Sequence, residues 1–186
     1  IRRACGLRLG CRCRTSFRAG KEPGLFMASP RDIRKLALLA MYQLDATKGE
    51  DTESVRDALD DVETLEDEGL SFVDQHAEFS AGEREKAFRL AVNAWEQRGD
   101  ADAVLSELST EWSVSRMPVV DRSILRLAHY EMTRVEGSEP KGVVNEAVEL
   151  AKQFSTEHSP GFVNAILDKI LKRVLAGGSS VVNEGN

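Results

Sequence analysis

Three helical patterns follow one another almost without interruption in residues 117–172. Each repeats apolar side chains at helical spacing: Val120, Ile124, Leu127 and Ala128; then Val143, Ala147, Leu150, Ala151 and Phe154; then Val163, Ile166, Leu167, Ile170, Leu171 and Val174. Pro140 and Pro160 suit first helical turns, Ser159 is a candidate N-cap, and Gly137 suits a helix end. Helices joined by so few residues are expected to pack together as the core of an all-α domain.

Similar patterns precede this region. Ser29 and Pro30 suit a helix start, and an apolar stripe follows them: Ile33, Leu36, Ala37, Ala40, Met41 and Leu44. A second stripe begins after Glu83 and ends at Gly99, and Asp100 is expected to cap a shorter helix. No segment alternates like a strand over a useful length. The sequence therefore predicts about seven helices and no sheet.

The first 26 residues differ in composition from the rest of the chain. They hold seven Lys or Arg against one acid and all three cysteines, whereas the remaining residues carry 18 basic and 30 acidic side chains. This composition suits an RNA-binding arm or a transit peptide. However, the sequence begins with Ile1 rather than Met, and Met27 stands just before the first predicted helix, which favours a different interpretation. We interpret residues 1–28 as a basic disordered extension or a misplaced start, 29–175 as the helical domain, and 176–186 as a disordered tail.

The segment 49–82 carries twelve acids and one base. Val55, Leu59 and Val62 are spaced for a short helix, and we interpret most of the segment as a poorly ordered, solvated connection. Its acids lack the spacing of an EF-hand, and Cys11 and Cys13 lack the further ligands of a zinc site, so no metal is predicted. The sequence contains neither a secretory segment nor a run of ~18 apolar residues. We therefore expect no membrane association and a cytoplasmic location.

The chain offers no recognisable catalytic site. It has no Gly-rich phosphate loop, dinucleotide turn or nucleophile elbow, and its three histidines are isolated. Carboxylates such as Glu146, Glu149 and Asp168 lie in predicted helices that also carry Lys152, Lys169 and Lys172, so ordinary surface pairs account for much of them. These features predict a protein that is not an enzyme and needs no cofactor.

Basic and aromatic residues are the remaining candidates for function. Arg31, Arg34 and Lys35 lie in a first helical turn, where cations oppose the helix dipole. Arg122 and Arg126 share a helix face, and Phe162 opens the last helix. Cations that contact phosphates and an aromatic that stacks on a base are typical of proteins that bind single-stranded RNA. The alternatives are that Arg122 and Arg126 pair with Asp121 or Glu131, and that Phe162 is a core residue.

These residues resemble the NusB family of transcription antitermination factors. The matching blocks are Arg31-x-x-Arg34 with Ala40-Met41-Tyr42-Gln43, VDRSILRLAHYE at 120–131, VVNEAVELAKQFS at 143–155 and FVNAILDK at 162–169. The resemblance covers about residues 30–175 and implies two small helical bundles in a cytoplasmic bacterial protein. It further implies binding to the boxA element of nascent ribosomal RNA transcripts, together with the small-subunit ribosomal protein NusE, in a complex on RNA polymerase. A homodimer is left open.

The resemblance also implies roles for individual residues. Arg31 and Arg34 match the arginine-rich RNA contact of the family, Phe162 matches an aromatic that stacks on RNA, and His158 lies in the loop beside it. Arg122 and Arg126 match a block that lies near RNA and partner in the family. Tyr42 and Asp121 match positions at the NusE interface. The arginine cluster is thinner than in relatives, because Pro30 and Asp32 stand where basic residues are frequent, and Asp32 is expected to offset Arg31.

Two other functions are weighed against this one. A NusB-like domain also occurs at the N-terminus of ribosomal RNA cytosine methyltransferases, so the chain would then be a fragment of such an enzyme. The second alternative is a helical protein-interaction module without RNA contact, which leaves the basic first turn unexplained.

Overall fold

The computed structural model describes residues 26–60, 77–109 and 113–178. Its helices are α1 (Pro30–Thr47), α2 (Thr52–Asp60), α4 (Ala81–Glu96), α5 (Arg98–Leu108), α6 (Val119–Arg134), α7 (Pro140–Phe154) and α8 (Ser159–Gly178), with a short 3₁₀ helix, η1 (Val114–Arg116), before α6. The predictions for residues 1–25, for residues 61–76 of the acidic connection and for residues 179–186 fall outside the described residues. Within the described part of that connection, Thr52–Asp60 forms α2 and buries Val55 and Leu59.

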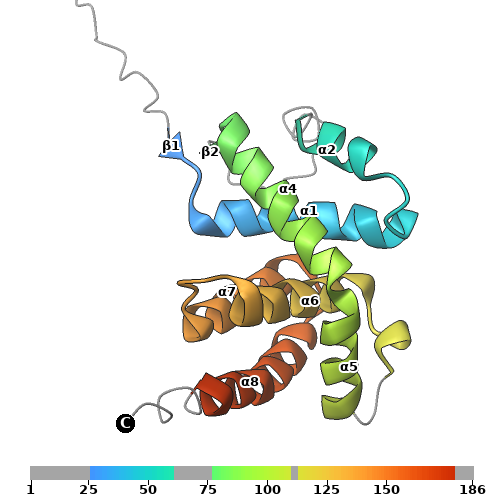
Figure 1. Cartoon of the computed structure of the whole chain (residues 1–186), viewed down its shortest axis with the longest axis vertical. Coiled ribbons are helices and arrows are strands. Elements are labelled where there is room, and N and C mark those ends of the chain that lie inside the picture. The colour runs from blue at the N-terminus through green and yellow to red at the C-terminus, as the bar shows by residue number, and fades with distance from the viewer. Residues whose placement is uncertain (1–25, 61–76, 110–112, 179–186) are drawn as a thin grey trace, which may run out of the picture.

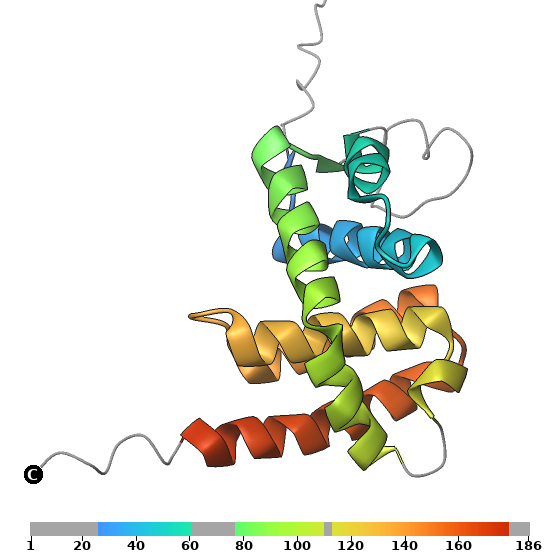
Figure 2. The ribbon, with the colours of Figure 1, turned by 45° about the vertical axis from the view of Figure 1, so that its right-hand side comes forward.

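The helices form two bundles, as the resemblance implies. One contains α1, α2 and α4, and the other contains α5, α6, α7 and α8. The bundles meet where α1 and α4 pack on α6. Figures 1 and 2 show α4 and α5 as a nearly continuous column along both bundles, with a break at Gln97 between them. The described residues therefore confirm the predicted all-α class and the prediction of about seven helices.

One short β pairing was not predicted. Phe26–Met27 (β1) pairs in parallel with Ala77–Glu78 (β2). Strands of two residues are too short to show an alternating pattern, so the sequence carries no signal for them. The pairing brings the start of the helical domain beside the segment that leads into α4 (Figure 1).

The start of α1 is fixed by its own sequence. The Ser29 hydroxyl accepts a hydrogen bond from the Asp32 backbone N–H (3.2 Å), and the Asp32 carboxylate accepts one from the Ser29 backbone N–H (3.0 Å). This is a capping box, and it confirms Ser29 as the N-cap. Asp32 caps the helix and pairs with Lys35 (3.4 Å), and its charge acts on Arg31 only through space.

Two other predicted helix starts differ in the structure. Ser159 is the first residue of α8, and its hydroxyl donates to Asp121 of α6 (2.8 Å) instead of capping its own helix. Asp100 lies inside the first turn of α5, which begins at Arg98. Pro140 does open α7, and Gly137 lies in the turn after α6 with φ 73°.

Gly49 follows the end of α1 and packs closely against Trp95, which is buried. Its φ is +78°, and a Cβ at this position would overlap the indole ring of Trp95. We expect Gly49→Ala to lower the free energy of unfolding by roughly 1–3 kcal/mol, because both backbone strain and overpacking oppose it. Gly99→Ala is the control, since Gly99 lies in α5 with open space around it. Its expected effect is a gain of about 0.5–1 kcal/mol. Urea unfolding, monitored by circular dichroism, measures the stability of both variants. Equal changes in the free energy of unfolding would contradict the prediction.

Across residues 26–60, 77–109 and 113–178, no helix combines the length and apolar character that crossing a membrane requires. Within the same ranges, no three His, Cys, Asp or Glu side chains gather closely enough to hold a metal ion.

Candidate nucleic-acid interface

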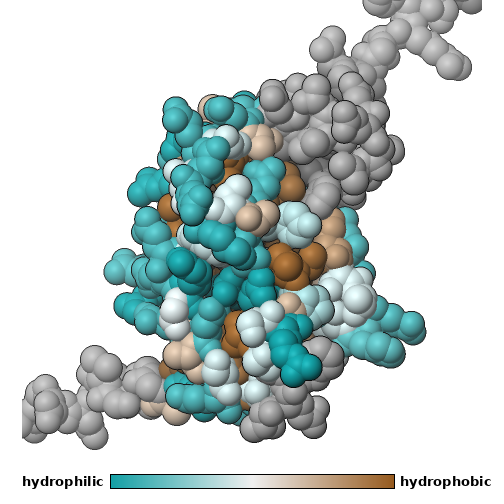
Figure 3. Space-filling view, turned by 90° about the vertical axis from the view of Figure 1, so that its right-hand side faces the viewer, coloured by the Kyte–Doolittle hydropathy of each residue, from teal (hydrophilic) through white to brown (hydrophobic). Residues whose placement is uncertain are grey.

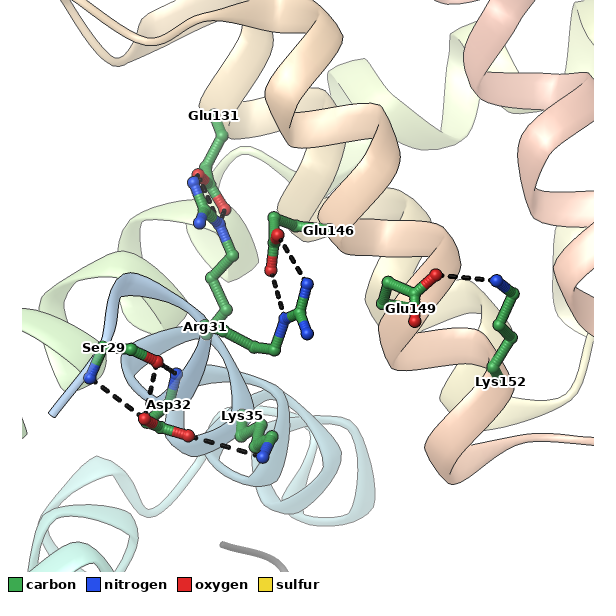
Figure 4. A network of polar contacts seen from close by, with 9 residues as sticks. Ser29, Arg31, Asp32, Lys35, Glu131, Glu146, Glu149 and Lys152 are labelled. Carbon is green, nitrogen blue, oxygen red and sulfur yellow. Dashed lines mark hydrogen bonds and ion pairs between the residues drawn. The ribbon is translucent and has the colours of Figure 1, made fainter. Parts of the chain in front are cut away.

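Arg31 presents the exposed cation of the first turn of α1. Its side chain is 47% exposed, and its guanidinium donates from Nε and Nη2 to the two carboxylate oxygens of Glu146 on α7, at 2.7 and 2.9 Å (Figure 4). Hydrogen bonding by Arg31 lowers the pKa of Glu146 below its ordinary value, although partial burial opposes this shift. The pair joins the first bundle to the second at the surface.

Arg34 forms a deeper link between the bundles. Its Nε lies 3.0 Å from each carboxylate oxygen of Glu131 on α6, and its Nη2 lies 2.6 Å from one of them. Glu131 is buried, with a side chain only 9% exposed. Arg34 therefore neutralises a buried carboxylate, which makes it a structural residue as well as a candidate RNA contact.

Lys35 does not take the position predicted for it. The residue is 3% exposed, and its ammonium pairs with Asp32 at the start of the same helix. α1 is covered by α4 and by α6, so more of its circumference is buried than its apolar stripe alone predicts. This burial does not fit a direct contact between Lys35 and a phosphate.

A groove of about 710 Å³ lies between the first turn of α1 and the start of α7. Arg31, Arg34 and the helix cap Asp32 line it from α1. Ser138, Asn145 and the acids Glu139 and Glu146 line it from α7 and the turn before it. Arginine, hydroxyl and amide side chains are the groups that contact nucleic-acid phosphates and sugars. The groove is therefore the best candidate for an RNA backbone path among the described residues.

Arg122 and Arg126 also differ from the prediction, because both are buried. Arg122 donates to Asp45 of α1 (2.6 Å) and to the Val114 carbonyl of η1 (3.3 Å). Arg126 donates to the other oxygen of Asp45 (3.2 Å) and binds Asp102 of α5 through two bonds of 2.8 and 2.6 Å. The alternative that these arginines form ion pairs is correct, but their partners are Asp45 and Asp102 rather than Asp121 or Glu131.

We call Asp45, Arg122, Arg126 and Asp102 the buried ion network. Its members come from α1, α6 and α5, so it connects both bundles. The Arg126 guanidinium also lies over the Trp95 ring of α4, 5.6 Å from its centroid. These contacts assign the two arginines to holding the bundles together rather than to contacting phosphates. The sequence analysis did not find Asp45 or Asp102.

Phe162 lies at the edge of a second hollow, with a volume of about 350 Å³. Its ring is half-buried and packs partly against the core, so the alternative of core burial holds in part. The other lining residues include Met117, Pro118, Thr156 and the exposed His158. A largely apolar hollow beside an aromatic ring has the character of a site for an unstacked base.

The two residues predicted to bind a protein partner differ in exposure. Tyr42 is 50% exposed on α1, which suits a partner contact. Asp121 is 3% exposed, and its carboxylate accepts hydrogen bonds from the hydroxyls of Ser155 and Ser159. Asp121 thus fixes the α7–α8 connection, and its burial does not fit a direct partner contact. On the face shown in Figure 3, hydrophobic residues form small separate patches among hydrophilic ones.

Comparisons with known proteins agree with one another. The family model described as "NusB family" matches residues 31–172. The transcription antitermination protein NusB of Symbiobacterium thermophilum is 40% identical over 144 residues, which cover 77% of this chain and 90% of that protein. The protein of the same name from Elusimicrobium minutum is 37% identical over 149 residues, which cover 78% and 95%.

Solved structures show the same similarity. NusB of T. maritima superposes with a TM-score of 0.60 at 33% identity, over 78% of this chain and 93% of that one. A chain from a crystal structure of the antitermination factors NusB and NusE with double-stranded RNA has a TM-score of 0.58 at 24% identity, over 77% and 96%. At that identity the second likeness supports the fold alone.

Proposed function

The chain belongs to the NusB family of transcription antitermination proteins, and we propose that it binds the boxA element of nascent ribosomal RNA transcripts together with NusE. Members of this family act by binding rather than by catalysis, and the protein is not an enzyme. The proposed setting is the bacterial cytoplasm, in a complex on RNA polymerase. The relatives named above are antitermination proteins, which favours this function over that of a methyltransferase domain.

The observation that carries the proposal is the exposed guanidinium of Arg31 at the edge of the groove. The groove is lined by two arginines, Arg31 and Arg34, in a body (residues 27–186) whose net charge is -12. Phosphate contacts supply a large share of the affinity of such proteins for nucleic acid. The groove at Arg31 supplies a place for them.

The hollow beside Phe162 supplies a place for a base. The groove lies near the start of α7 and the Phe162 hollow near its end, and this 15-residue helix is about 22 Å long. We propose that the RNA runs along this side of the second bundle, with phosphates at Arg31 and an unstacked base at Phe162. His158 lies at the same hollow and adds a polar contact to that base.

Tyr42 is the proposed anchor for NusE, because half-exposed tyrosines are frequent in the centre of protein interfaces. Binding of one partner is expected to raise the affinity for the other, a coupling typically worth about 1–3 kcal/mol. A homodimer that uses one of these surfaces would compete with that assembly.

The direct test is binding of a single-stranded boxA RNA across a salt series, with and without the ribosomal protein. We expect log K to fall with log[salt] by about 0.7 for each phosphate contacted, and the partner to strengthen binding. Absence of RNA binding in both conditions, with a helical protein in solution, would refute the proposal. Salt-insensitive binding of the ribosomal protein without RNA binding would instead indicate an interaction module.

Arg31→Ala is expected to weaken RNA binding by roughly 1 kcal/mol, or about five-fold, because one charge-assisted phosphate contact is lost. The salt slope should become shallower by about 0.7. Arg173→Ala is the matched control, since Arg173 is similarly exposed (49%) and pairs with Glu107 at 2.7 Å. Equal losses for the two variants would show that only net charge matters.

A further inference from the structure

We infer that Glu146 sets the RNA affinity of this protein: it occupies the guanidinium of Arg31 in the free protein, and an RNA phosphate binds there by displacing it. The inference rests on the proposed RNA-binding function, and it identifies a carboxylate of the protein as the competitor of the RNA. Glu146 is on the opposite wall of the groove from Arg31.

The geometry of the pair supports direct competition. Glu146 binds the Nε–Nη2 edge of Arg31 through two nearly equal hydrogen bonds, 2.7 and 2.9 Å long (Figure 4). A phosphate presents two oxygens to the same edge of a guanidinium in the same two-bond arrangement. Glu146 and a phosphate therefore cannot both take this edge. The carboxylate stands where a backbone phosphate of the RNA would bind.

The exposure of the pair makes the exchange feasible. Arg31 and Glu146 have side chains 47% and 24% exposed, so their attraction is partly screened by water and salt. RNA adds the release of condensed counterions when its phosphates are neutralised, which a single carboxylate does not offer. After displacement, Glu146 keeps contact with solvent and remains within the field of Arg34, which also stabilises its charged form.

Arg34 differs from Arg31 in this respect. Its partner Glu131 is buried, and three contacts of 2.6–3.0 Å hold the two side chains together. Separating them would leave an uncompensated buried carboxylate, which strongly disfavours exchange. Arg34 therefore stays bound to Glu131, and Arg31 is the cation that changes partner when RNA binds.

The test compares two substitutions that remove the same charge from the same helix. Glu146→Gln should tighten binding of a single-stranded boxA RNA by about two- to five-fold at 0.15 M salt, the range expected when a competing surface ion pair is lost. Glu149→Gln is the matched control. Glu149 hydrogen-bonds Lys152 (2.7 Å), while its charge acts on Arg31 only through space (Figure 4). Its effect should stay below about two-fold, because such interactions are screened.

The same pair of substitutions in an Arg31→Ala background completes the experiment. In that background Glu146→Gln should raise RNA affinity no more than Glu149→Gln does, because the Arg31 guanidinium that Glu146 would release is absent. Equal gains for the two glutamines in the wild-type background, or a gain from Glu146→Gln that persists without Arg31, would overturn the inference. If the inference is overturned in this way but wild-type RNA binding still depends on Arg31, the proposed function remains intact. Absence of wild-type binding with and without the ribosomal protein would refute both.

Discussion

Asp45→Ala is expected to lower the free energy of unfolding by about 3–5 kcal/mol, the cost of breaking a buried ion pair by removing one partner. Asp45 is the carboxylate that Arg122 and Arg126 share, at 2.6 and 3.2 Å, and all three residues are buried. Without it, the Val114 carbonyl is the one hydrogen-bond acceptor that Arg122 keeps among the described residues. The change also removes a contact between the two bundles, because Asp45 is on α1 and the arginines are on α6.

Two further variants test whether burial, rather than charge, causes the loss. Asp168→Ala removes an exposed pair with Lys172 and should cost less than about 1 kcal/mol. Asp102→Ala should lower the free energy of unfolding by an amount between those for Asp45→Ala and Asp168→Ala, because the Asp102 side chain is 31% exposed and Arg126 still pairs with Asp45. Denaturant unfolding gives all three values. A cost for Asp45→Ala no larger than that for Asp168→Ala would refute the structural role of the network.

Low pH should weaken the ion pairs that Asp45 forms with Arg122 and Arg126. Burial alone would raise the pKa of Asp45, but hydrogen bonding and the charge of Arg122, with Lys48 and Arg126, hold it below its ordinary value. A carboxyl group with a lowered pKa in the folded state contributes stability that is complete above its unfolded pKa, about 4, and is lost as the pH falls through the folded pKa. The difference in stability between wild type and Asp45→Asn should therefore shrink below about pH 4.

Local features of the fold could be predicted from the sequence. The helix start at Ser29 and Pro30 depends on residues within one turn of each other, and the structure shows Pro30 at the first helical position and a capping box between Ser29 and Asp32. The apolar stripes of α6, α7 and α8 are also local, and their residues form much of the core. Such features are determined within a few residues, so spacing alone reveals them.

The pairing of charges could not be predicted in the same way. Arg122 lies 77 residues after Asp45, and Arg34 lies 97 residues before Glu131. Sequence reasoning could offer the arginines only neighbours on their own helix, such as Asp121 or Glu131. The packing of α1 on α6 determines the true partners, and no local pattern encodes which faces meet. This is why a cluster expected to bind RNA separates into one exposed cation, Arg31, and several buried ones.

Phe162→Ala is the change with the largest expected effect on RNA binding. Loss of base stacking on an aromatic side chain costs about 1–3 kcal/mol, which corresponds to roughly 5- to 150-fold in affinity. Phe162 is half-buried against the core, so we also expect some loss of stability, smaller than the 3–5 kcal/mol typical of a fully buried phenylalanine. RNA titration and thermal unfolding of the same samples measure the two effects separately.

Two variants distinguish stacking from packing. Phe162→Leu keeps apolar bulk at the edge of the hollow but has no ring, so it should retain most of the stability and lose most of the affinity that alanine loses. Phe88→Ala is the matched control, because Phe88 is also half-buried against the core, on α4 beneath Arg56. It should lower stability and leave RNA affinity unchanged. If Phe162→Leu instead binds RNA like wild type, Phe162 acts by packing, and the base-binding role of the hollow is refuted.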